Sequence, residues 1–136
     1  MIKELIELMQ NQEKELQTLI ELLETQYKMI MSKDVFGLEG LVDKINECGK
    51  RIAKEEVQRR NIIGERSIKD IVYNSDNEEI KQSYGKIQTT LNKVILQKET
   101  NDMLLKQQML FNNKMLQMLS PNREVRTYNS YGNLGR

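Results

Sequence analysis

The sequence has no histidine and no tryptophan, and it has a single cysteine and a single proline in 136 residues. Without histidine, the chain lacks the side chain that most often performs acid–base catalysis near neutral pH and the commonest metal ligand. The lone Cys48 excludes an internal disulfide and a cysteine-only zinc site. Its acidic residues are scattered along charged helix faces. We therefore expect no enzyme, no metal and no cofactor.

The charges of the chain are balanced, with 21 Lys and Arg against 20 Asp and Glu. A balanced chain has no overall field to attract nucleic acid or an anionic membrane. No uninterrupted apolar run approaches the ~20 residues that a membrane span requires. The first residues are already amphipathic and include an acid, unlike a signal peptide. We expect a cytoplasmic protein, which suits a free thiol, with no nucleic-acid binding and no membrane insertion.

Apolar residues recur at helical spacing from the start of the chain. In residues 2–31 they fall seven apart, a pattern that winds a helix around a partner helix: Ile2, Met9, Leu16, Leu23 and Ile30. Residues 32–34 supply a stop and a fresh N-cap. A second predicted helix covers residues 35–72, where Cys48 falls on the apolar stripe and is expected to be buried. Its glycines each weaken an isolated helix by about 1 kcal/mol, so it needs neighbours.

Cap and turn formers at residues 73–77 separate this segment from a third predicted helix over residues 77–119. Ser75 or Asp76 can cap that helix, and Pro121 cannot continue it. Residues 120–136 are polar and contain glycine, so we expect disorder there. The sequence thus predicts an all-α fold: an elongated antiparallel three-helix bundle or coiled coil over residues 1–119, with a flexible C-terminal tail.

The end of the third predicted helix, residues 103–119, differs from the rest of the chain. It holds four of the eight methionines, ten apolar residues among seventeen, and no acid. At about 100° per residue, its apolar residues form two flanks roughly 120° apart, with Leu119 between them. One flank comprises Leu105, Met109 and Leu116, and the other comprises Leu104, Phe111, Met115 and Met118. This arc is wider than the arc that a single packing seam uses. We therefore expect one flank to join the core and the other to lack a partner within the chain.

Methionine adapts to irregular surfaces, and an exposed apolar patch usually marks a binding site. We therefore predict a partner-binding surface that captures a helix. Its residues are Leu104, Leu105, Met109, Phe111, Met115, Leu116, Met118 and Leu119. Two alternatives remain: a wide three-helix core, or burial against a second copy in a structural coiled-coil protein that self-associates as a homo-oligomer. Asn101, Gln108 and Asn112 lie on or near the seam and either set its register or face solvent.

Several segments occur in a recognisable order along nearly the whole chain. They are residues 22–27 (LLETQY), Lys33-Asp34, residues 38–42 (LEGLV), Arg59-Arg60, residues 101–105 (NDMLL), and the tail Tyr128-Asn129-Ser130-Tyr131-Gly132. In this order and spacing the chain resembles the FlgN family of flagellar export chaperones.

The resemblance implies a cytoplasmic chaperone of type III secretion. Such a chaperone binds the C-terminal helical segments of the hook–filament junction proteins FlgK and FlgL and delivers them to the export gate. In the family the C-terminal helix binds the cargo, which corresponds here to residues 103–119. A tyrosine beyond that helix is associated with docking to the gate component FlhA, and Tyr128 or Tyr131 could match it.

Overall fold

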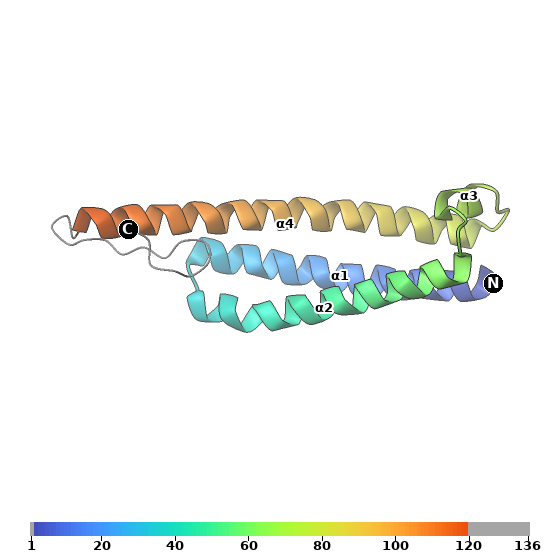
Figure 1. The fold of residues 1–136 in the computed structure, drawn as a ribbon, viewed down its shortest axis with the longest axis horizontal. Helices are drawn as coiled ribbons and strands as arrows, with labels where there is room; N and C mark the ends of the chain where they lie inside the picture. The colour runs from blue at the N-terminus through green and yellow to red at the C-terminus, as the bar shows by residue number, and fades with distance from the viewer. Residues whose placement is uncertain (1, 120–136) are drawn as a thin grey trace. The chain divides into compact units, whose positions relative to one another are not determined.

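A computed structural model describes residues 2–119, which form four α-helices and no strand (Figure 1). The helices are α1 (Ile2–Ser32), α2 (Val35–Ile63), α3 (Ile68–Tyr73) and α4 (Glu78–Leu119). The chain divides after Asn101 into two units, the second beginning within α4 at Asp102. The all-α prediction is confirmed. The tail predicted at residues 120–136 lies outside the described residues.

The number of helices corrects the prediction, because residues 35–72 do not form a single helix. Gly64 ends α2 with φ of 65° and donates its backbone N–H to the Arg60 carbonyl at 2.8 Å. A positive φ is readily adopted by glycine, which lacks the Cβ that disfavours it. Ser67 then precedes the short α3. Described residues therefore contain three long helices and a short fourth one, in place of the three predicted.

The turn between α1 and α2 confirms the predicted stop and cap. Lys33, with φ of 59°, donates its N–H to the Ile30 carbonyl, and Asp34 donates its N–H to the Met29 carbonyl, so these two carbonyls near the end of α1 are satisfied. The Asp34 carboxylate then accepts the Gly37 N–H at 2.9 Å and caps α2. A Cβ on Gly37 would collide with that carboxylate, so the close approach requires glycine.

The residue that caps the start of α4 differs from the two that were predicted. Its cap is Asn77, whose Oδ1 accepts the N–H groups of Glu79 at 2.9 Å and Ile80 at 3.3 Å. Ser75, one of the two predicted caps, instead accepts the Asn77 N–H at 3.1 Å and fixes the residue that caps the helix.

The first unit has a core that draws on all four helices. Within residues 1–101, α2 runs antiparallel beside α1, and the first part of α4 follows α1 in the same direction (Figure 1). The core cluster comprises Leu5, Ile6, Met9, Leu16, Ile20, Leu23, Ile63, Val72, Ile80, Tyr84, Ile87 and Val94. The seven-residue series of α1 supplies Met9, Leu16 and Leu23 to this core, as its spacing predicted.

Polar side chains also join α1 to both of its neighbours. On the α2 side, Arg51 Nε lies 2.9 Å from a carboxylate oxygen of Glu15. On the α4 side, Gln17 donates its amide to the Thr90 hydroxyl at 3.1 Å. Among residues 2–119, none of the helices has both the length and the apolar character needed to cross a bilayer.

Candidate partner-binding helix face

The eight residues predicted to bind a partner all lie on α4 after Asn101, and we call them the terminal apolar face. Six of them are exposed: Met109, Phe111, Met115, Leu116, Met118 and Leu119. Phe111 is 57% exposed, and Met118 and Leu119 are 75% and 73% exposed. The other two, Leu104 and Leu105, are half-buried. The face thus leaves several large apolar side chains in contact with water.

The expectation that one flank of this face joins the core is wrong for residues 109–119. Met109 and Leu116 from one flank are exposed, and so are Phe111 and Met118 from the other. The physical reason lies in the extent of the first unit, whose core cluster takes no residue from beyond Val94 on α4. Residues of both flanks are therefore exposed.

After Asn101, the burial and the types of residue on α4 change along two series of residues spaced seven apart. In the first series, Ile80, Ile87, Val94 and Asn101 are buried, and Gln108 and Met115 follow them. In the second series, the buried Ser83 and Thr90 are small and polar, while Leu104, Phe111 and Met118 are large and apolar. The helix thus widens its apolar surface where the first unit ends.

Asn101 itself is completely buried at the end of the first unit. Its side-chain amide donates to the Leu23 carbonyl at 2.8 Å and to Gln26 Oε1 at 2.9 Å, and its own oxygen accepts from Gln97 at 3.0 Å. A buried amide requires such partners, since an unsatisfied one is costly. Asn101 therefore joins α4 to α1, and of the two alternatives given for it, exposure to solvent is wrong.

The charges on this part of α4 are few and of one sign. Residues 103–119 contain Lys106 and Lys114 and no acid. At about 100° per residue, Lys114 lies roughly 40° and Lys106 roughly 60° outside the two edges of the terminal apolar face. Long lysine side chains can lie along an apolar surface and still reach a charge at its rim. The face is therefore compatible with a helix that carries acidic residues beside an apolar stripe.

The rest of the first unit contains a polar cluster that holds α2 to α1. Cys48 is buried, as predicted, and its thiol donates to the Glu15 carbonyl at 3.3 Å. Burial raises the pKa of this thiol, and the Glu15 charge raises it further, which disfavours the reactive thiolate. Burial and then Glu15 also raise the pKa of Glu55. The described residues include no group of His, Cys, Asp or Glu suited to a metal ion.

Three arginines of α2 form ion pairs with acidic residues. Arg59 lies 2.7 Å from Glu56, and Arg60 lies 3.3 Å from the same carboxylate. Arg51 pairs with Glu15 on α1. Interleaved acidic and basic residues thus pair within α2 and between α2 and α1.

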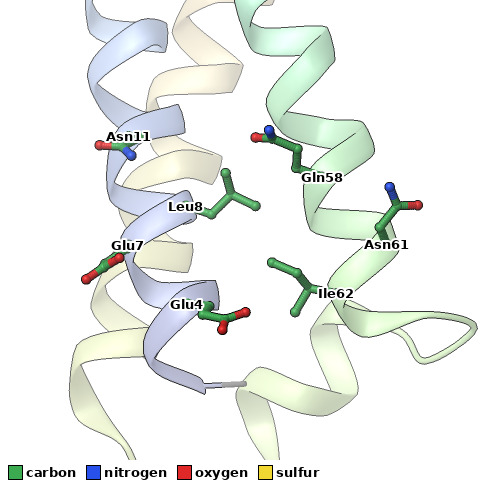
Figure 2. A pocket seen from close by; sticks show the side chains of 7 residues that line it. All are labelled: Glu4, Glu7, Leu8, Asn11, Gln58, Asn61 and Ile62. Carbon is green, nitrogen blue, oxygen red and sulfur yellow. The ribbon is translucent and has the colours of Figure 1, made fainter.

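An open hollow of about 410 Å³ lies between α1 and α2. Leu8 and Ile62 point toward one another across it (Figure 2). The remaining lining residues are polar: Glu4, Glu7, Asn11, Gln58 and Asn61. These residues offer carboxylates and amides, with no histidine, cysteine or basic group among them.

One exposed aromatic residue was missed by the sequence analysis. Phe36, near the start of α2, is 87% exposed, and Val35 and Met31 beside it are exposed as well. The signal was present, because Phe36 lies well away from the stripe of Leu38 and Leu41 at helical spacing. The predicted gate-docking residues Tyr128 and Tyr131 lie outside the described part of the chain.

Comparison with known proteins gives one family. The family model described as FlgN protein matches residues 1–136, the whole chain. Searches of curated proteins and of solved structures returned no significant match. A match over the entire length agrees with the order of segments noted in the sequence, and the chain belongs to the FlgN family of flagellar export chaperones.

Proposed function

We propose that this chaperone acts in the cytoplasm, where it binds the C-terminal helical segments of FlgK-like and FlgL-like junction proteins through its terminal apolar face. The supporting observation is the exposure of both flanks of that face on one continuous helix, α4. A helix is the fitting occupant, because the residues follow a helical period and the same side of α4 packs against the α1 helix earlier in the chain. Membership of the family assigns the protein to flagellar export.

Burial of apolar surface would drive the binding. Each large side chain transferred from water to an apolar interface contributes about 1.5–3 kcal/mol. Part of this gain is offset because a disordered cargo segment must be ordered when it binds. A moderate net affinity suits a chaperone, since the cargo has to leave it for secretion.

The proposal is tested with the full-length protein and purified C-terminal fragments of the junction proteins. Phe111→Asp should weaken binding by about a hundredfold, because a carboxylate would be placed in an apolar contact. Met115→Asp should act in the same direction. Leu110→Asp is the matched control, since Leu110 is exposed but lies outside the arc of the terminal apolar face at helical spacing. Isothermal titration calorimetry gives the affinities, and circular dichroism checks the fold.

Equal loss of binding in the Leu110 and Phe111 variants would contradict the assignment of the face. Unchanged binding in the Phe111 and Met115 variants would remove that assignment altogether. The alternative of a self-associating coiled-coil protein rests on the same exposed residues. Light scattering after size-exclusion chromatography separates the two, since a tight oligomer that takes up no fragment would favour self-association.

We further propose delivery to the export gate through FlhA, with Tyr128 or Tyr131 as the docking residue. This step rests on the family resemblance. Changing both tyrosines to alanine is expected to abolish binding to a purified FlhA fragment and to leave cargo binding unchanged, because the two sites are separate in sequence. A pull-down with each partner measures both effects. Retained FlhA binding in the double variant would contradict the role of these tyrosines.

A further inference from the structure

Asn112 is an amide side chain in the middle of the terminal apolar face. It lies seven residues from both Leu105 and Leu119, and three and four residues before Met115 and Leu116. Residues at these spacings share one side of a helix. Asn112 is exposed in the described structure. A partner helix that covers Met115 and Leu116 would therefore cover Asn112 as well.

The same helix shows what a buried asparagine needs on this side. Asn101 precedes Asn112 by eleven residues, which places the two within about 20° of each other around α4. Asn101 is fully buried, with hydrogen bonds to the Leu23 carbonyl and to Gln26 on α1 and to Gln97 on α4. The α1 helix thus supplies two acceptors opposite this amide. A partner helix that covers Asn112 must likewise supply hydrogen-bond acceptors for its amide.

A partner with an unbroken aliphatic stripe meets it only in part. Such a helix would remove water from the Asn112 amide and offer main-chain carbonyls like that of Leu23, but no side-chain acceptor like Gln26 Oε1, which is unfavourable. A partner with a hydrogen-bonding side chain at the matching level avoids this cost. Single polar residues at the inner positions of coiled coils select register and partner in this way, at some cost in affinity.

We propose that Asn112 is a specificity-determining residue of the terminal apolar face. It selects amphipathic helices whose apolar stripe carries one Asn, Gln, Ser or Thr, and it rejects helices whose stripe is wholly aliphatic. The inference rests on the proposed function and names the class of segment that the chaperone accepts. Discrimination of this kind suits a cytoplasmic chaperone, because many other amphipathic helices compete for an exposed apolar surface.

The test uses the full-length protein and two synthetic amphipathic helical peptides as probes. The peptides differ in one residue, a Gln or a Leu at the centre of the apolar stripe. The wild type should bind the Gln peptide about tenfold more tightly than the Leu peptide. Asn112→Leu should abolish or reverse that preference and bind the Leu peptide more tightly than the wild type does. Fluorescence anisotropy of labelled peptides gives the ratios.

Asn113→Leu is the matched control, because it makes the same change one residue later, outside the arc of the face. It should retain the wild-type preference. If the wild type binds the junction-protein fragments but shows no preference between the peptides, or if Asn112→Leu leaves the preference unchanged, the inference is wrong and the proposed function stands. If the wild type binds neither fragments nor peptides, both are wrong.

Discussion

Replacing Ile80 by alanine is expected to lower the free energy of unfolding by about 2–5 kcal/mol. Ile80 is fully buried in the first turns of α4 and belongs to the core cluster that also contains Leu5 and Val72. Its removal leaves a cavity that close-packed neighbours fill only in part. Urea unfolding followed by far-ultraviolet circular dichroism measures the change. A loss below about 1 kcal/mol would contradict the burial assigned to this residue.

The matched control is Leu119→Ala at the other end of the same helix. Leu119 is an exposed residue of the terminal apolar face, so the free energy of unfolding should change by no more than about 0.5 kcal/mol. The contrast separates residues that stabilise the fold from residues whose side chains are exposed. A large loss that grows with protein concentration would indicate that the face is buried between copies of the chain.

Much of the first unit follows from simple periodicity. In α1, four members of the predicted series, Met9, Leu16, Leu23 and Ile30, are buried. Gln12, which interrupts the inner positions, is also buried and donates to Glu56 at 3.2 Å. A repeat of seven predicts which side of a helix is covered. It does not say which polar residue on that side finds a partner, because the partner comes from another helix.

The sequence analysis did not identify the break between α2 and α3. The apolar spacing does change there, because Ile68 follows Ile62 and Ile63 by six and five residues rather than by three or four, across Gly64. Gly40 and Gly49 lie within α2 and do not interrupt it. A glycine permits a positive φ but does not require one. Packing of α3 onto the core, through residues such as Val72, distinguishes Gly64 from the other glycines.

The apolar stretch at the end of α4 was predictable from the sequence, but the exposure of its individual residues was not. The width of the apolar arc over residues 103–119 correctly indicated more apolar surface than one seam covers. It could not indicate that Met109 and Phe111, on opposite flanks, are both exposed. That outcome depends on where the core ends, which is a property of the folded chain. Asn101 marks the end of the core more clearly than any apolar residue does, because it has specific hydrogen-bond partners on α1.

Replacing Asn101 by alanine is expected to lower the free energy of unfolding by about 2–3 kcal/mol. The change removes the hydrogen bonds to the Leu23 carbonyl and to Gln26, and it leaves a cavity between α1 and α4. It also removes the acceptor of the Gln97 amide. Urea unfolding provides the measurement, with the wild type under the same conditions. A change within about 0.5 kcal/mol would mean that these hydrogen bonds do not hold the helices together.

Asn101→Leu tests what the amide contributes beyond its volume. A leucine extends the apolar series of Ile80, Ile87 and Val94, and the half-buried Gln26 and Gln97 can turn to water. We expect this variant to recover most of the stability lost in the alanine variant, because replacing a polar contact by a packed apolar one is often nearly neutral. If leucine is as harmful as alanine, the hydrogen bonds stabilise the end of the first unit directly. If it recovers stability, the asparagine is retained to set the register of α4, from which the terminal apolar face continues.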